Sequence, residues 1–335
     1  MGIKEDIAKF RESRDRGLGY LIGIQGEDGS FGKEEEGVDA YYKIPYLFAI
    51  TGHNEKGLKL LDWIEKYHLT DNGDFRSQSR KGMSEFHSYY YTYANCWPVK
   101  GAQKLGRFDI SFKGVKFLLK HQDKKLGGFR GRLFSDPDPT LEVHSTAWCG
   151  LALLYTGYVE PAVKGGDFLI KMLDEQPEIE DYLYVNYHPE EGIITEGIDD
   201  FFLGVSTHKE KQFYVYPGMA MAFLSKLYLA TGEERFLKAA QKYLDFALSC
   251  QEDVLASPPS GKLAFGASTL FTITGEERAR DAALKISRYL LTIQNPDGSW
   301  SHPWNPDTAS YGLIDLTAEF TLWLTEIIYN LSAKE

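Results

Sequence analysis

A short phrase that recurs along the chain constrains its fold more than any other feature. In each copy an amphipathic helix ends near a glutamine, a polar turn with a glycine follows, and an aromatic residue comes next. The two clearest copies are residues 25–31 (QGEDGSF) and 294–300 (QNPDGSW), and a third runs from Gln122 to Phe129. Three weaker copies lie at residues 72–75, at Gln176 with 191–192, and at Gln251 with 260–261. Six copies of one phrase predict six stacked structural units.

Two kinds of helix alternate between these turns. After each of the first five turns a second helical run stops at a glycine, which suits a helix C-cap: Gly52, Gly106, Gly157, Gly232 and Gly275. The runs before these stops, such as 142–155 and 214–228, are apolar on nearly every side, as buried inner helices are. The runs after them, such as 234–251, are amphipathic and read as outer helices. We therefore predict an all-α fold, a single domain over residues 1–335 in which six helix pairs close into a ring, with an open solenoid as the alternative.

The phrase resembles the repeat signature of the terpenoid cyclase and protein prenyltransferase superfamily. The resemblance implies an (α/α)6 toroid of the squalene-hopene cyclase kind, in which the glutamine and the tryptophan of the phrase tie one repeat to the next. It thus implies a structural role for Gln25, Gln122, Gln294 and Trp300. A looser, local likeness to the linalool dehydratase-isomerase type of toroid covers residues 136–149 and 184–192.

The chain also departs from this superfamily in its reactive residues. The strings at 136–139 and 197–200 do not match the Asp-x-Asp-Asp acid of class II terpene cyclases. No cysteine follows Cys250, so the zinc site of prenyltransferases is not expected. Glycosidases, polysaccharide lyases and sugar epimerases share the (α/α)6 scaffold, and a funnel rich in tyrosine, tryptophan and carboxylates suits a sugar.

Composition narrows the classes of function. The net charge is −11 and no stripe of lysine or arginine is present, which argues against nucleic acid. No signal peptide and no apolar run of membrane-spanning length is evident, so we expect a cytoplasmic location and no membrane span. Three widely spaced cysteines predict reduced thiols. Motifs for phosphate cradles and zinc helices are absent, so no cofactor and no metal are expected. Assembly into a homo-oligomer is left open.

The candidate site residues stand where the inner helices begin, because every inner helix is entered from the same side of the ring and the first turns meet there. The first inner helix offers Asp39, Tyr41 and Tyr42. Asp39 is a candidate general acid or base, with a capping carboxylate as the alternative.

The second inner helix opens with several tyrosines. His87, Tyr91 and Asn95 are four residues apart, which places them on one face of a continuous helix. Such a face would present an imidazole, a phenol and an amide to one ligand, and His87 is a further candidate for proton transfer. The alternative is a packed aromatic core.

The third inner helix gives the strongest candidates. Glu142 and His144 enter an otherwise apolar helix, and Trp148 shares the face of His144. His144 is the best candidate for proton transfer because its charge changes near neutral pH, and Glu142 would orient it. A structural histidine bonded to a backbone carbonyl is the alternative. Cys149 is either a nucleophile or a small buried hydrophobe.

The later repeats add binding residues. Tyr214 and Tyr216 stand at the start of the fourth inner helix, Trp304 lies in the last loop, and Tyr311 and Asp315 lie on the final helix. We expect these side chains to contact substrate.

These residues predict an enzyme without a cofactor that performs acid/base chemistry on an apolar, terpenoid-like small molecule. The reaction would be a cyclisation, an isomerisation or a hydration/dehydration, and aromatic rings would stabilise developing positive charge. Two alternatives stay open. One is a carbohydrate-active (α/α)6 enzyme, and the other is a helical-repeat binding protein without catalytic activity.

Overall fold

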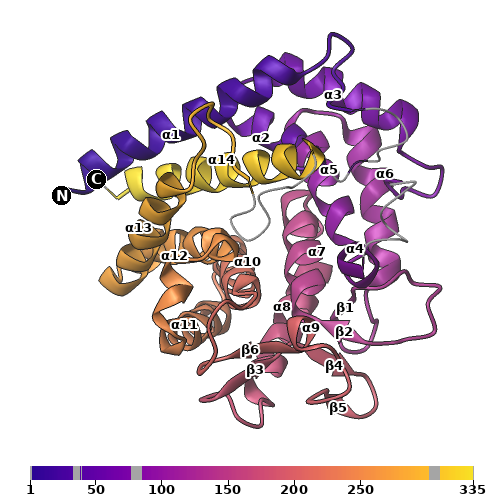
Figure 1. Cartoon of the computed structure of the whole chain (residues 1–335). Helices are drawn as coiled ribbons and strands as arrows, with labels where there is room; N and C mark the ends of the chain where they lie inside the picture. The colour runs from indigo at the N-terminus through magenta and orange to yellow at the C-terminus, as the bar shows by residue number, and fades with distance from the viewer. Residues whose placement is uncertain (1, 33–37, 39, 77–84, 302–309, 335) are drawn as a thin grey trace.

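The computed structural model describes residues 2–32, 38, 40–76, 85–301 and 310–334. Outer and inner helices alternate along the described chain, as the sequence predicts (Figure 1). The outer helices are α1 (Ile3–Ile24), α3 (Asn54–Tyr67), α6 (Phe108–Leu118), α8 (Val159–Asp174), α11 (Glu234–Ser249) and α13 (Glu277–Thr292). The inner helices are α2 (Ile44–Ile50), α5 (Tyr93–Lys104), α7 (Val143–Tyr155), α10 (Val215–Thr231), α12 (Gly261–Thr274) and α14 (Ser310–Ser332).

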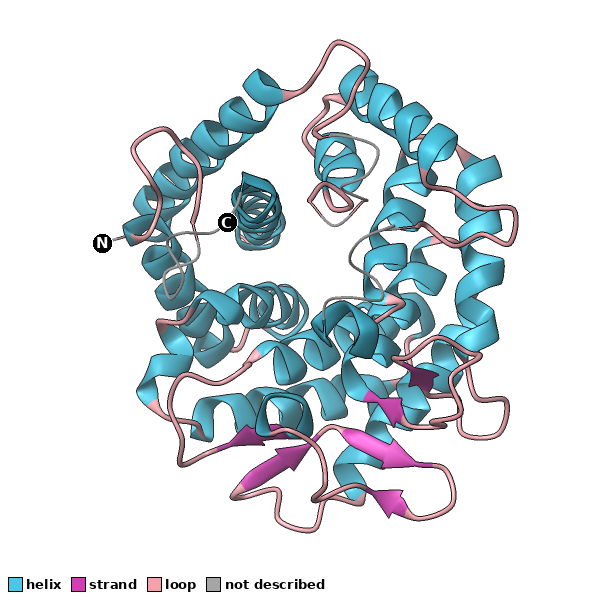
Figure 2. Cartoon of the chain, turned by 45° about the vertical axis from the view of Figure 1, so that its right-hand side comes forward, coloured by secondary structure: helices cyan, strands magenta, loops and turns pink. Residues whose placement is uncertain are grey.

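The ring of inner helices is closed. Each of α2, α5, α7, α10 and α12 packs against the next, and α14 packs against both α12 and α2. The first outer helix, α1, packs against the last pair, α13 and α14, and Figure 2 shows the helices arranged around a common centre. The fold is therefore an (α/α)6 toroid, and the open solenoid is excluded. In the part of the chain that the structure describes, no helix has the length and apolar character needed to cross a membrane.

The repeated glutamine links neighbouring units. The Gln25 amide donates to the carbonyl oxygens of Gly29 and Lys56, both at 3.1 Å, and so joins the turn to the next outer helix. Gln122 donates to Pro161 O at 2.8 Å in the same way. Gln294 donates to Ser13 O at 2.9 Å, which ties the last repeat to the first. The structural role implied for these glutamines is confirmed.

Short strands occupy the connections before α7 and α10, at one edge of the ring (Figure 2). Four form an antiparallel sheet in the order β1-β2-β4-β5, from β1 (Phe129–Arg130), β2 (Leu141–Glu142), β4 (Asn186–His188) and β5 (Gly192–Ile193). A second pair joins β3 (Tyr182–Tyr184) to β6 (Gly204–Ser206). The repeat pattern did not predict these strands, because each has only two or three residues. They position the starts of α7 and α10.

Three tryptophans fill the axis of the ring. Trp97 of α5, Trp148 of α7 and Trp323 of α14 are all buried. The ring centroids of Trp97 lie 4.6 Å from Trp148 and 5.8 Å from Trp323. These three rings form a packed layer between the inner helices, which we call the tryptophan floor.

Candidate active site

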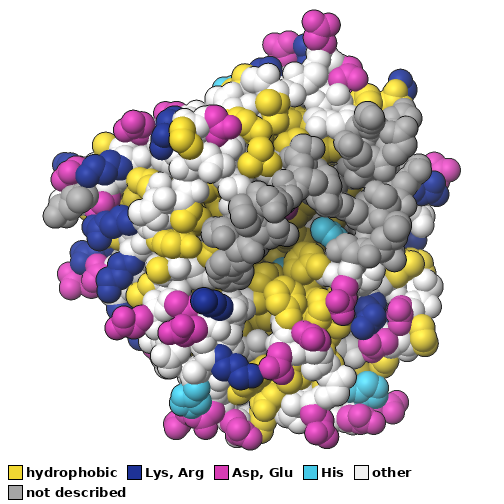
Figure 3. All heavy atoms as spheres, viewed as in Figure 1, with side chains coloured by type: hydrophobic (Ala, Val, Ile, Leu, Met, Phe, Trp, Pro, Cys, Tyr) yellow, Lys and Arg dark blue, Asp and Glu magenta, His cyan; other side chains and the backbone are white. Residues whose placement is uncertain are grey.

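A cavity of about 280 Å³ opens where the inner helices begin, as the repeat pattern predicts. Figure 3 shows a hollow in this face of the molecule, with hydrophobic side chains in its wall. Both charged and aromatic side chains line the cavity. The charged side chains are Lys43, Lys262, Asp315 and Glu319, and the others include Tyr42, Phe86, His87, Tyr93, Phe213 and Phe320.

The charged wall is a connected cluster of four side chains. Lys43, just before α2, donates to Asp315 Oδ1 at 2.7 Å and to Glu319 Oε2 at 2.5 Å. Lys262, in the first turn of α12, bonds the other oxygen of Glu319. Three of these side chains are buried, and only Asp315 is partly exposed, at 27%. Buried charges require such partners, since an unpaired ion inside a protein is strongly unfavourable.

The groups of this charged cluster differ in the direction in which their pKa values are shifted. Burial alone would raise the pKa of Glu319, but the ammonium groups of Lys262 and Lys43 outweigh it and hold that pKa well below its usual range. Burial raises the pKa of Asp315 in spite of Lys43. Burial lowers the pKa of Lys262 in spite of Glu319. Glu319 is therefore a fixed anion. Asp315 is the partly exposed carboxyl group of the cluster.

The aromatic wall comes from the residues just before α2 and α10, from α5 and from the short helix α4 (Glu85–Tyr89). Tyr42 and Tyr93 meet edge to face, with ring centroids 5.5 Å apart. Phe86, in α4, packs against Phe213 at 5.9 Å. Lys43 Nζ lies 4.9 Å from the centroid of Tyr42, so the charged and aromatic walls touch. A ligand here would therefore meet aromatic rings and charged groups together.

His144 lies behind this aromatic wall. Its ring packs among Tyr90, Tyr93 and Phe213, with centroids 4.3 Å, 5.0 Å and 6.2 Å away. The indole N–H of Trp148 donates to His144 Nε2 at 3.1 Å, so the neutral ring carries its proton on Nδ1. Burial, reinforced by Lys262, lowers the pKa of His144 well below its usual value. The structure therefore argues against our expectation that His144 changes charge near neutral pH.

Glu142 does not orient His144 as the sequence led us to expect. It is the N-cap of α7, and its Oε1 accepts from the backbone N–H of Ser145 at 2.7 Å. Its other oxygen is buried and has no hydrogen-bond partner among the described residues. Burial raises the pKa of Glu142 to about 8, so the carboxyl group is mostly protonated at neutral pH.

The raised pKa of Glu142 predicts a pH-dependent stability that Glu142→Gln removes. The folded protein binds this proton up to about pH 8, whereas the unfolded chain releases it near pH 4.5. Stability of the natural protein should therefore fall as pH rises through this window, by up to about 1.4 kcal/mol per pH unit. The free energy of unfolding, measured in urea from pH 5 to pH 8, should fall with pH in the natural protein but not, or less, in Glu142→Gln. The exposed control Glu12→Gln should show the same pH dependence as the natural protein. If the free energy of unfolding depends on pH in the same way in Glu142→Gln and in the natural protein, the pKa of Glu142 is not raised.

Three predicted binding residues of the first two inner helices lie away from the cavity. The Tyr41 hydroxyl bonds His68 Nε2 at 2.8 Å. Tyr91 and Asn95 both bond the carboxylate of Asp74, at 2.5 Å and 2.9 Å. The shared face with His87 is not formed, because α4 ends at Tyr89 and α5 begins only at Tyr93. His87 and Tyr42 do line the cavity.

Other predicted residues serve packing or loop contacts. Trp148 belongs to the tryptophan floor, and Cys149 lies with its Sγ 3.8 Å from Cys96 Sγ. Burial raises the pKa of Cys149 well above its usual value, which disfavours the nucleophilic thiolate. The Tyr214 hydroxyl donates to Asp253 Oδ1 at 2.7 Å. The Tyr216 hydroxyl donates to Phe201 O at 2.9 Å, behind the aromatic wall.

The remaining predicted residues either lie outside the part of the chain that the structure describes or belong to the charged cluster. Asp39 and Trp304 lie outside the described residues, as does the side chain of Tyr311. Asp315 lines the cavity. Neither Lys262 nor Glu319 is among the site residues predicted from the sequence, although both line the cavity. A signal was present, because a lysine in the first turn of a buried helix requires an acidic partner. Among the described residues no cluster of three or more potential metal ligands occurs.

Solved structures with the same fold include enzymes of several kinds. An α-mannanase of Bacteroides thetaiotaomicron superposes with a TM-score of 0.67 at 11% identity, over 97% of each chain. A D-mannose isomerase gives 0.67 at 11% identity over 96% of this chain and 97% of its own. A type II terpene cyclase from Scytonema superposes with a TM-score of 0.60 at 13% identity, over 98% of this chain and 100% of its own. Comparisons with protein-family models and with curated protein sequences gave no match. The chain thus has the (α/α)6 toroid fold that both terpene cyclases and sugar-converting enzymes use.

Proposed function

We propose that this protein is an enzyme that isomerises or epimerises a sugar by proton transfer in the cavity at the inner-helix starts. The observation that carries the proposal is the mixed lining of the cavity, in which four charged groups lie beside aromatic rings. Sugar hydroxyls pair with charged groups, and the C–H faces of a sugar pack on aromatic rings. A hydrocarbon would leave the charged wall without any polar contact, which is unfavourable.

Proton transfer beside a carbonyl group suits the side chains of the cavity. Asp315 is partly exposed and has a raised pKa, so it can accept or donate a proton, and His87 provides a second acid/base group. The positive charges of Lys43 and Lys262 would stabilise the oxygen on which negative charge develops when the neighbouring carbon loses its proton.

Glycoside hydrolysis is a weaker fit to the same residues. It uses two carboxyl groups, one of which must be a protonated acid. The two carboxyl groups among the described cavity residues are Asp315 and Glu319. Glu319 is held between Lys43 and Lys262, so it is not available to rotate toward a sugar. The mannose isomerase with this fold supports the isomerase type of reaction. A sugar epimerase from a ruminal bacterium, which superposes with a TM-score of 0.62 at 12% identity over 94% of this chain and 98% of its own, supports it too.

A terpenoid substrate is the second candidate, and the aromatic wall favours it. Rings of Tyr42, Phe86 and Phe213 at one cavity would stabilise a carbocation by cation–π contact. The type II terpene cyclase with this fold supports this reading. Against it stands the charged wall, where Lys43 and Lys262 would repel the same cation.

Deuterium exchange tests the proposal without knowledge of the product. The purified protein is incubated in D2O with a panel of aldoses and ketoses, and NMR follows exchange at the carbon next to the carbonyl. We expect exchange with at least one sugar, and a loss of roughly 100-fold or more in Asp315→Asn and His87→Asn. The exposed control Asp71→Asn should retain the full rate.

Two outcomes separate the candidates. No exchange with any sugar, together with a rise in Tm on adding isoprenoid alcohols alone, would overturn the sugar proposal and favour the terpenoid candidate. Exchange that persists in both variants would show that the proton is taken by residues other than Asp315 and His87.

A further inference from the structure

A second, larger hollow adjoins the candidate active site. It has a volume of about 500 Å³ and lies between β6, the following loop and the start of α10. Phe213 and Pro259 line both this outer groove and the inner cavity. The groove and the inner cavity are therefore neighbours that share part of their lining.

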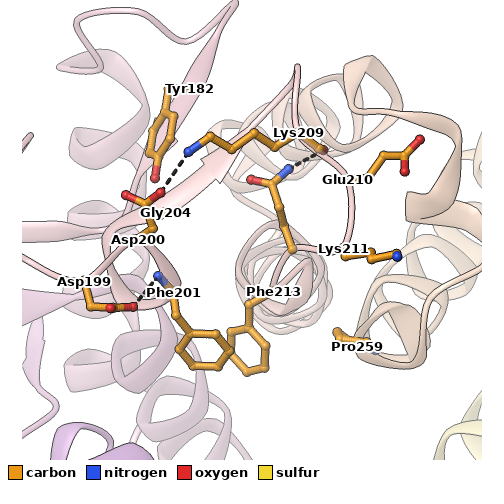
Figure 4. A pocket seen from close by; sticks show the side chains of 11 residues that line it. Tyr182, Asp199, Asp200, Phe201, Gly204, Lys209, Glu210, Lys211, Phe213 and Pro259 are labelled. Carbon is orange, nitrogen blue, oxygen red and sulfur yellow. Dashed lines mark hydrogen bonds and ion pairs between the residues drawn. The ribbon is translucent and has the colours of Figure 1, made fainter. Parts of the chain in front are cut away.

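Aromatic rings form a continuous path between the two spaces. The rings of Phe201 and Phe213 lie side by side in the groove, with centroids 4.7 Å apart and planes 35° from parallel (Figure 4). Phe86, at the inner cavity, lies 5.9 Å from Phe213 and 6.5 Å from Phe201. Phe201 is 43% exposed although its ring contacts Phe202 and Phe213. An exposed phenylalanine beside an active-site cavity offers a flat apolar surface to a ligand.

Polar side chains border this aromatic surface. Lys209 donates to Asp200 Oδ2 at 2.8 Å across the groove, and Glu210 and Lys211 stand at the opposite rim (Figure 4). The charged lining residues are two lysines and three acids, Asp199, Asp200 and Glu210, so neither sign dominates. Such a border suits a neutral ligand with many hydroxyl groups better than an ion or a hydrocarbon.

The loop that carries this border is held in a defined conformation. Lys211 adopts a positive φ of 57°, which is uncommon for a residue other than glycine. Its backbone N–H donates to Asp253 Oδ2 at 2.7 Å. The Gln212 side chain bonds both the N–H and the carbonyl oxygen of Ser206, each at 2.7 Å. The groove is therefore preformed, and strained backbone of this kind is often found at ligand sites.

We propose that the outer groove binds the second unit of a neutral disaccharide or longer oligosaccharide whose reducing-end unit occupies the inner cavity. This inference rests on the proposed sugar chemistry and names its substrate class. The second unit would lie against the ring of Phe201, with its hydroxyls toward Lys209 and Asp200.

Calorimetric titration tests this inference. Glucose and mannose are compared with cellobiose, maltose and a 1,6-linked mannobiose. At least one disaccharide should bind the natural protein tenfold or more tightly than either monosaccharide. Phe201→Ala should lower the affinity for that disaccharide by about 3- to 10-fold, as expected for one lost ring contact, and should leave the affinity for monosaccharides unchanged. Phe108→Ala is the matched control, since Phe108 is 50% exposed and stacks on Phe112 away from both cavities.

The outcomes distinguish this inference from the function on which it rests. If mono- and disaccharides bind with equal affinity while a monosaccharide still exchanges deuterium, the groove does not bind a second sugar unit. The proposed sugar function would be unaffected by that result. Equal loss of mono- and disaccharide affinity in Phe201→Ala would also overturn it, since Phe201 would then act on the inner cavity. If no sugar binds and none exchanges deuterium, the proposed function and this inference fall together.

Discussion

Glu319→Gln is expected to lower the free energy of unfolding by about 3–5 kcal/mol, because it removes one partner from a buried ionic cluster. Glu319 is the common partner of Lys43 and Lys262, and all three side chains are buried. Asp315 remains as a partner for Lys43, but the amide of the variant takes away the one ion-pair partner that Lys262 has among the described residues. Urea unfolding at pH 7 measures the loss.

Two controls identify the cause of this loss. Glu175→Gln removes an exposed partner of Lys171 and should cost no more than about 1 kcal/mol. The double variant Lys262→Met with Glu319→Gln removes both charges and should recover much of the lost stability. A double variant as unstable as Glu319→Gln alone would show that packing, rather than an unpaired ammonium group, explains the effect.

The pH dependence of the same variant has a definite sign. The lysines hold the pKa of Glu319 well below the value of 4.5 that it has in the unfolded chain. A carboxyl group with a lowered folded-state pKa stabilises the protein above its unfolded-state pKa, and this contribution is lost as pH falls. The gap between the natural protein and Glu319→Gln should therefore be widest near neutral pH and should narrow below about pH 4.5.

The architecture could be predicted from the sequence because its cause is local and repeated. The glutamine at the end of an outer helix bonds the turn glycine and the next outer helix, so Gln25, Gln122 and Gln294 mark the units in sequence as they do in space. The inner helices are apolar on every side because they are enclosed by outer helices and by one another. A two-residue strand such as β2 leaves no periodic signal, which is why the strands were missed.

The location of the candidate site was predictable, but most of its residues were not. The starts of the inner helices do surround the cavity, and His87, Tyr42 and Asp315 line it as expected. The orientation of each side chain depends on where its helix begins. The break between α4 and α5 turns Tyr91 toward Asp74, and the N-cap role of Glu142 takes its carboxyl group away from His144. The partners of a buried charge come from other repeats, as with Lys262 and Glu319, so a single helix does not reveal them.

Lys100→Met is expected to stabilise the protein at neutral pH. Lys100 lies on α5 at the side of the tryptophan floor away from the candidate site, and its side chain is only 4% exposed. Its Nζ lies 4.1 Å from the ring of Trp97 and 4.4 Å from that of Tyr46. Burial lowers the pKa of Lys100 to about 7, although Glu326 raises it in part. The rings recover some of the cost of burial by cation–π contact, about 1–2 kcal/mol, but they do not replace a counter-charge.

The sign of the pH dependence follows from the direction of this shift. The folded protein releases the Lys100 proton near pH 7, whereas the unfolded chain keeps it to about pH 10.5. The natural protein should therefore gain stability as pH rises above 7, and the advantage of Lys100→Met should shrink. We expect an advantage of about 1–3 kcal/mol at pH 6.5 that falls by about 2 kcal/mol at pH 9, since a shift of one pKa unit corresponds to about 1.4 kcal/mol.

Urea unfolding of both proteins at the two pH values gives this comparison directly. Lys104→Met is the matched control, because Lys104 is an exposed residue of the same helix with its Nζ 5.8 Å from the ring of Tyr155. Its effect should stay within about 0.5 kcal/mol at both pH values, as is usual for surface substitutions. A Lys100→Met protein that is less stable than the natural one at pH 6.5 would mean that the rings and Glu326 together hold a charged Lys100 favourably. In that case the contacts of Lys100 with the rings of Trp97 and Tyr46 would stabilise the toroid.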